Sequence, residues 1–127
     1  MKKLLIIDDE VPTLSMLKLF LGTLGYTVLT AEKVDDGIEI FKEEKPCIVL
    51  TDIKMPGKDG FSALSSIKSI DPAAEVIVIT GHGDKDLARK AFDLNASDFL
   101  HKPLDTEALE KALRKVENRL EERSERV

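Results

Sequence analysis

Five short apolar runs, separated by segments of helical length, constrain the fold of this 127-residue chain more than any other feature. The runs are Lys3–Ile7, Thr27–Thr30, Cys47–Thr51, Val76–Thr80 and Asp98–Leu100. The central runs contain consecutive Ile and Val residues without polar alternation, which is typical of strands buried on both faces of a parallel sheet. The runs therefore predict a core of parallel strands.

The segments between these runs carry apolar residues at helical spacing, and Pro12 stands where a first helical turn tolerates proline. The expected helices begin near Val11, Val34, Gly60, Lys85 and Thr106. The inward stripe of the first is Val11, Leu14, Leu17, Leu21 and Leu24, and that of the fourth is Leu87, Ala88, Ala91 and Phe92. The fourth stripe is thin, so we expect its helix to be held least firmly.

Five strand-then-helix units favour an α/β fold, because a parallel strand is reached by a right-handed crossover through a helix. We expect a doubly wound five-stranded parallel sheet of order 2-1-3-4-5, flanked by five helices in the flavodoxin-like arrangement. This order places the first and third strands side by side where the winding reverses. Ligands bind there, beyond the carboxyl ends of the strands.

Polar residues follow the strands that meet at this edge. They are Asp8 and Asp9 after the first strand, Asp52 after the third, Thr80 at the end of the fourth, and Lys102 after the fifth. Taken singly, each aspartate would be a helix cap, and the threonine and lysine ordinary strand-end and surface residues. Together they form a carboxylate cluster with oxygen ligands and one ammonium, which suits Mg²⁺.

Composition narrows the classes of function. The net charge is −5 and no basic stretch is present, so we expect no nucleic-acid binding by this chain. No apolar run is long enough for a membrane span and no signal peptide opens the sequence, and the single Cys47 excludes an internal disulfide. These features favour the cytoplasm.

The residues at the strand ends, together with the segment "DIKMPGKDG" after the third run, resemble the receiver domain of two-component response regulators. The resemblance covers about Lys2 to Arg119. The stretches "ITGHGD" and "DFLHKPLDTEAL" are similar to receivers of the transcription-activator type.

The resemblance implies a set of site roles. Asp52 is the phosphoacceptor that attacks the phosphohistidine of a sensor histidine kinase or a histidine phosphotransfer protein. Asp8, Asp9, Asp52 and the backbone carbonyl of Lys54 hold Mg²⁺. Lys102 pairs with the phosphoryl oxygens.

The resemblance also implies a switch. Thr80 hydrogen-bonds the new phosphate and Phe99 changes rotamer, which alters the surface of the fourth helix, fifth strand and fifth helix. The Lys102–Pro103 peptide bond is expected to be cis. The altered surface controls an output domain or a separate partner, and a homodimer formed on phosphorylation is a further option.

Two positions tune the lifetime of the phosphate in this interpretation. Lys54 and His82 lie two residues after Asp52 and Thr80, beside the path of an attacking water. A long cation at Lys54 predicts slow loss of phosphate.

The first helix carries more apolar surface than its inward stripe needs. Met16, Leu19 and Phe20 lie beside that stripe. They either dock the kinase or phosphotransfer partner or pack against the fifth helix.

Two other classes of protein share parts of this pattern. A flavodoxin-like nucleotide or flavin binder needs an anion cradle after the first strand, where this chain has "DDEVP". A Mg²⁺-dependent phosphohydrolase with an aspartyl nucleophile would carry that nucleophile on the first strand in an Asp-x-Asp pattern. We expect a phosphoacceptor domain without separate substrate turnover, rather than an enzyme.

We expect one domain. Residues 1–119 form the receiver domain, and residues 120–127 are a C-terminal helical extension or the start of a linker. Past Leu120 the apolar period fades, so a frayed helix is expected there.

Overall fold

The computed structural model describes residues 2–55, 57–81 and 85–125. Its strands are β1 (Lys3–Ile7), β2 (Thr27–Ala31), β3 (Ile48–Asp52), β4 (Glu75–Thr80) and β5 (Asp98–His101). Its helices are α1 (Val11–Thr23), α2 (Val34–Glu44), α3 (Gly60–Ile70), α4 (Lys85–Asp93) and α5 (Thr106–Glu125). Strand and helix alternate throughout, as the sequence predicts.

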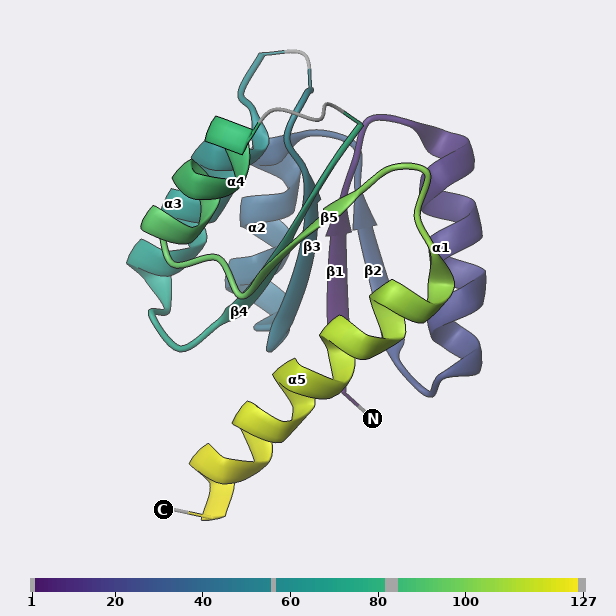
Figure 1. Cartoon of the computed structure of the whole chain (residues 1–127), viewed down its shortest axis with the longest axis vertical. Coiled ribbons are helices and arrows are strands. Elements are labelled where there is room, and N and C mark those ends of the chain that lie inside the picture. The colour runs from purple at the N-terminus through teal and green to yellow at the C-terminus, as the bar shows by residue number, and fades with distance from the viewer. Residues whose placement is uncertain (1, 56, 82–84, 126–127) are drawn as a thin grey trace.

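The five strands form one sheet in the order β2-β1-β3-β4-β5, and every neighbouring pair is parallel. The predicted fold class and strand order are therefore confirmed. The carboxyl ends of the strands lie at the top of Figure 1, together with the loops that leave β1, β3 and β5.

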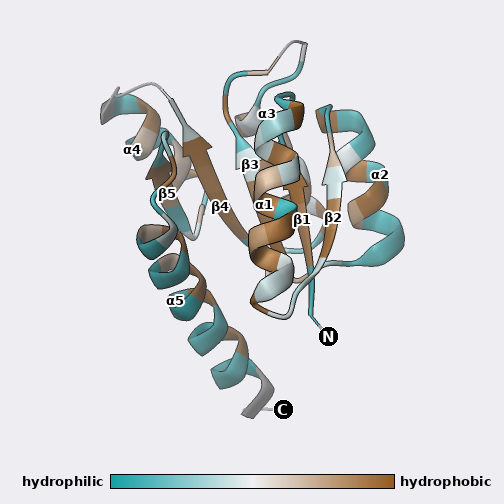
Figure 2. Ribbon diagram, turned by 90° about the vertical axis from the view of Figure 1, so that its right-hand side faces the viewer, coloured by the Kyte–Doolittle hydropathy of each residue, from teal (hydrophilic) through white to brown (hydrophobic). Residues whose placement is uncertain are grey.

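Two hydrophobic layers cover the sheet. Alternate residues of each strand enter different layers: Leu5 and Ile7 of β1 pack with α2, α3 and α4, whereas Leu4 and Ile6 pack with α1 and α5. Figure 2 shows the strands as mostly hydrophobic ribbons between helices whose outer turns, in α2 and α5, are hydrophilic. Among the described residues, no helix is long and apolar enough to cross a membrane.

The helix stripes are narrower than the sequence predicts. Val11 and Leu24 at the ends of the α1 stripe are about half exposed, and only the three leucines between them, Leu14, Leu17 and Leu21, are buried. Phe92 of α4 was expected to face inward but is half exposed, and of the described side chains of α4 only Ala91 is buried. Thus α4 is held by little apolar contact.

The boundaries of β2, β3, β4 and β5 differ by one residue from the predicted runs, and α5 is longer than predicted. β4 begins at Glu75, one residue earlier than predicted, because this buried carboxylate is neutralised by Arg119 and Arg123 of α5. The same contacts keep α5 helical to Glu125, where the sequence suggested fraying after Leu120. Figure 1 shows α5 continuing past the amino-terminal edge of the sheet.

Candidate phosphoacceptor and metal site

The site forms where β1 and β3 lie side by side. Ile7 pairs with Thr51 in the register of the two strands, so Asp8 and Asp52 leave the sheet next to each other. Both carboxylates are nearly inaccessible to solvent, with Asp8 2% and Asp52 5% exposed. Two buried like charges need a cation between them.

Lys102 supplies that cation from the loop after β5. Its ammonium lies 3.2 Å from Oδ2 of Asp8, 3.2 Å from Oδ2 of Asp52 and 2.8 Å from Oε1 of Glu10. The backbone N–H of Lys102 donates to the carbonyl of Thr80 at 2.7 Å, which anchors this loop to the end of β4. The lysine therefore joins three acids to the neighbouring strand.

Backbone donors orient the two buried aspartates. Ile53 N–H donates to Oδ1 of Asp52, and Glu10 N–H donates to Oδ1 of Asp8, both at 2.9 Å. In each residue the other oxygen, Oδ2, faces Lys102. One oxygen of Asp52 is thus held by the backbone while the second points into the pocket.

The charges shift the acid–base properties of the site. Burial and the adjacent Asp8 carboxylate raise the pKa of Asp52 above its ordinary value, against the opposing effects of Lys102 and the Ile53 N–H. Burial lowers the pKa of Lys102, but hydrogen bonds to Glu10 and Asp8 outweigh it and raise the net value. Lys102 lowers the pKa of Glu10. The lysine is therefore firmly charged, and an added cation would favour the ionised form of Asp52.

The loop after β3 depends on glycine at one position. A Cβ on Gly60 would lie 2.1 Å from the carbonyl oxygen of Asp52 and 2.8 Å from the Cα of Ile53. Gly60 N–H also donates to the Ile53 carbonyl at 2.9 Å. The first residue of α3 therefore packs directly on the backbone of the candidate phosphoacceptor, which only glycine permits.

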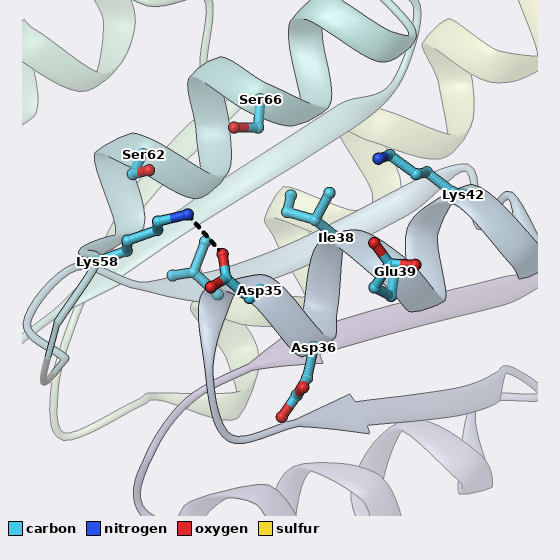
Figure 3. Close-up of a pocket in the computed structure, with 9 residues that line it drawn as sticks. Asp35, Asp36, Ile38, Glu39, Lys42, Lys58, Ser62 and Ser66 are labelled. Atoms are coloured by element: carbon cyan, nitrogen blue, oxygen red, sulfur yellow. Dashed lines mark hydrogen bonds and ion pairs between the residues drawn. The ribbon is translucent and has the colours of Figure 1, made fainter.

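The same loop is tied to α2 at the surface. Lys58 reaches Asp35 at 2.7 Å across the open end of a groove between α2 and α3, as Figure 3 shows. Both side chains are well exposed, so this pair contributes little to stability. The groove, of about 480 Å³, is lined by residues of α2, α3 and Lys58 and includes none of the acids around Lys102.

The predicted switch residues lie on neighbouring strands. Thr80 is fully buried at the end of β4, and it pairs with His101 of β5. Phe99 is half-buried against the layer of α2, α3 and α4, and its ring meets that of His101 edge-on with 5.2 Å between centroids. The Lys102–Pro103 peptide bond is cis, in agreement with the resemblance.

The structure groups the acids differently from the sequence interpretation. Ligand oxygens of Asp8, Glu10 and Asp52 lie within 4.8 Å of one another, whereas the half-buried Asp9 is outside this group. Lys54 is exposed, and His82 lies outside the described residues. The sequence interpretation assigned no role to Glu10, which it treated only as part of an acidic run. Its position directly after Asp8 and Asp9 could have indicated that it belongs to the site.

A family model described as the response regulator receiver domain matches residues 4–114. The chain belongs to this family. Receiver domains are the phosphoacceptor switches of two-component regulatory systems.

Individual relatives agree with this assignment. Chemotaxis protein CheY of Thermotoga maritima is 37% identical over 116 residues, covering 91% of this chain and 97% of CheY. A receiver domain protein of Clostridium thermocellum, solved by crystallography, has a TM-score of 0.90 and 39% identity, covering 95% of this chain and 98% of that chain.

A longer regulator is similar over about a quarter of its length. Transcriptional regulatory protein GlrR of Escherichia coli K12 is 36% identical over 110 residues, which cover 87% of this chain and 25% of GlrR. The chain thus spans about a quarter of the length of GlrR.

The donor set of this receiver domain fits a hard divalent cation. Three carboxylates and one lysine leave two negative charges, which one Mg²⁺ would balance. Mg²⁺ prefers oxygen ligands at 2.0–2.1 Å, so opposite ligands lie about 4.2 Å apart. Neighbouring ligands lie about 2.9 Å apart, so the oxygens of these three acids, which lie within 4.8 Å of one another, would draw together around one ion.

Proposed function

We propose that this receiver domain accepts a phosphoryl group on Asp52 from the phosphohistidine of a sensor histidine kinase or a histidine phosphotransfer protein. The observation that carries the proposal is the placement of the Asp52 carboxylate: buried, fixed at Oδ1 by Ile53 N–H, and presenting Oδ2 to Lys102 at 3.2 Å. The family supports a phosphoacceptor role in general; Asp8 shares this burial and these contacts, so the choice of Asp52 rests on its place at the end of β3 in the receiver motif.

The transfer needs positioning more than proton chemistry. Oδ2 of Asp52 attacks phosphorus as a carboxylate, the P–N bond of the donor breaks, and the imidazole leaves with the bonding electrons. Asp52 attacks in its ionised form, so no general base is required. Lys102 is placed to follow the phosphoryl oxygens because its ammonium already contacts the attacking oxygen.

We propose that Asp8, Asp9, Asp52 and the backbone carbonyl of Lys54 hold Mg²⁺ in the working state. The ion supplies charge neutralisation for the phosphoryl oxygens. Asp8 is held ready by the Glu10 N–H, and inclusion of Asp9 requires its side chain to join the group that Asp8 and Asp52 already form.

Phosphorylation adds a charge of about −1.5 to −2 and three acceptor oxygens beside Thr80. We propose that Thr80 moves toward them and that Phe99 turns into the space behind it. Two observations support this route: the Lys102 loop is bonded to the Thr80 carbonyl, and Phe99 packs on the layer that contains α4. Since α4 buries little apolar surface, the α4–β5–α5 face is the part most easily shifted.

We propose that the phosphoryl donor docks on α1, where Met16 and Leu19 are exposed, and that the output depends on the α4–β5–α5 face. We propose that the altered α4–β5–α5 face controls an output domain or a separate protein, with a homodimer on phosphorylation as one form of that output. We propose that this chain itself neither binds nucleic acid nor turns over a separate substrate. We propose the cytoplasm as its compartment. We propose that residues 1–119 form the receiver domain and that the rest of α5, to Glu125, is its helical extension.

Mass-spectrometric mapping after incubation with Mg²⁺ and acetyl phosphate tests the proposal. We expect one phosphate on Asp52, lost in Asp52→Asn and retained in the exposed control Glu43→Gln. Phosphate mapped to Asp8, or multiple turnover of a phosphomonoester, would favour the phosphohydrolase instead.

The switch is tested by backbone NMR shifts with and without phosphate. Changes in α4, β5 and Phe99 are expected. Changes confined to the loop after Asp52 would contradict the route through Thr80.

A further inference from the structure

We propose that Glu10 is a positioning residue for Lys102. It retains the ammonium at the mouth of the pocket when a divalent cation takes its place between Asp8 and Asp52, and so keeps it within reach of the incoming phosphoryl group. The inference rests on the proposed function of the site and adds a residue to it.

Distances and exposure distinguish Glu10 from the other two acids. It makes the shortest contact to Lys102, at 2.8 Å against 3.2 Å for each aspartate. Its side chain is 59% exposed whereas those of Asp8 and Asp52 are buried. Glu10 therefore holds the lysine from the solvent side, and Asp8 and Asp52 hold it from the inside.

The local structure of α1 shows that the Glu10 side chain is committed to this contact. Glu10 occupies the N-cap position, where a polar side chain usually accepts a backbone N–H of the first turn, yet it makes no such bond. Pro12 lacks an N–H, so the first turn has one fewer donor to satisfy. The Glu10 carboxylate therefore accepts no capping hydrogen bond and pairs with the Lys102 ammonium instead.

Charge explains why such a partner is useful. A divalent cation among the carboxylates of Asp8 and Asp52 repels the ammonium that now lies between them. A flexible lysine without another partner would then move into solvent, and its return to a phosphoryl group would cost side-chain entropy. Glu10 lowers this cost because it offers the displaced ammonium an acid outside the buried pair.

A double-mutant cycle on Mg²⁺ binding tests the proposal. The variants are Glu10→Gln, Lys102→Gln and the combination, with Mg²⁺ affinity measured by NMR amide shifts. We expect Glu10→Gln to weaken Mg²⁺ binding on the order of 3–10-fold with Lys102 present, and by no more than about 2-fold with Lys102→Gln, because the coupling runs through the lysine. Glu32→Gln, an exposed acid just after β2, makes the same charge change and controls for the long-range field.

Two results would overturn the inference. Equal weakening in both lysine backgrounds would make Glu10 a direct metal ligand, and an effect no larger than that of Glu32→Gln would leave it no specific role. Glu10→Asp, which keeps the charge on a shorter side chain, is expected to restore part of the affinity and part of the acetyl phosphate labelling rate.

The cycle is separable from the proposed function. If wild type is not phosphorylated at Asp52, the proposed function fails, while the coupling between Glu10 and Lys102 is still measured by Mg²⁺ titration.

Discussion

Arg123, near the end of α5, donates a hydrogen bond to Glu75, the first residue of β4, with 2.7 Å between Nη2 and Oε1. Arg119 donates to the same carboxylate from one turn earlier, and Ser97, just before β5, donates to it as well. Glu75 is 3% exposed. This cluster fixes the far half of α5 to the amino-terminal edge of the sheet, opposite the acids around Lys102.

Glu75→Gln is expected to lower the free energy of unfolding by about 1–3 kcal/mol, because it leaves two arginines beside a neutral amide. The exposed Glu122→Gln on the same helix should have an effect near zero. Urea denaturation measures both. Equal stability of the two variants would show that the cluster contributes nothing net.

The contribution of Glu75 should depend on pH in a defined direction. Burial raises the pKa of Glu75, but hydrogen bonds from Arg119 and Ser97 outweigh it, and Lys68 and Arg123 are the other charged groups that act on it. The net pKa lies below the ordinary 4.5. The native state therefore binds fewer protons, so the stabilisation is present above pH 4.5 and is lost as pH falls below it. The difference between wild type and Glu75→Gln should shrink in that range.

Gly60→Ala should both destabilise the domain and impair phosphorylation. The added Cβ would overlap the Asp52 carbonyl oxygen and the Ile53 Cα, and since both belong to the backbone, the backbone would have to shift. We expect a loss of about 2–4 kcal/mol in unfolding free energy and a slower acetyl phosphate labelling rate.

Gly22→Ala is the matched control for Gly60→Ala. Nothing lies within 4 Å of a Cβ at Gly22, which is inside α1, so a gain of about 0.5–1 kcal/mol is expected. Similar losses in the two variants would mean that the close contact at Gly60 is not the cause.

Leu19→Glu should impair phosphotransfer from a protein donor and leave acetyl phosphate labelling unchanged. Leu19 is 75% exposed and Met16 is about half exposed on the outer surface of α1, whereas Phe20 packs against the core layer shared with α5. A charge in an apolar docking surface should reduce transfer by about tenfold or more. Phe92→Glu, on α4, is the control for an exposed apolar residue elsewhere. Equal losses with both donors would point to a damaged fold instead.

Lys54→Ala should shorten the lifetime of the phosphate on Asp52. An exposed ion pair contributes about 0.2–1 kcal/mol, which corresponds to a roughly 1.5–5-fold faster loss. The half-life is measured after removal of the phosphodonor, and Lys42→Ala on α2 serves as the control. A longer half-life in Lys54→Ala would contradict shielding by the lysine.

Asp52→Asn should stabilise the domain at low salt without divalent cations. The raised pKa of Asp52 means that its ionised form is disfavoured in the folded state, and the amide can still accept the Ile53 N–H. A gain of about 1 kcal/mol is expected, against no change for the exposed Asp36→Asn. Added Mg²⁺ should stabilise the wild type more than the Asn variant.

The sheet could be predicted because its signal is local. Consecutive Ile and Val residues in β3 and β4 marked buried parallel strands, and chain topology then set the strand order. The positions of Asp8, Asp52 and Lys102 followed from the strand ends. Their common pocket was therefore predictable without any knowledge of side-chain contacts.

The two features that the sequence did not reveal both depend on distant partners. Glu75 directly precedes the predicted run Val76–Thr80 and received no role, because the arginines that neutralise it lie 44 and 48 residues away in sequence. Glu10 was treated only as part of an acidic run, and its contact with Lys102 depends on a residue 92 positions away. Hydrophobic periodicity does not contain such pairings.

The alternation of β1 between two layers has a consequence for how the domain avoids misfolding. Leu4 and Ile6 enter one layer and Leu5 and Ile7 the other. Because both faces of the strand are apolar, an alternation of polar and apolar residues does not fix its register. A slip by one residue toward the amino-terminal edge would leave aliphatic side chains at the positions of Leu4, Leu5 and Ile6, but it would place the Asp8 carboxylate at the buried position of Ile7. The carboxylate of Asp8, which we propose as a metal ligand, thus also disfavours a shifted register of β1.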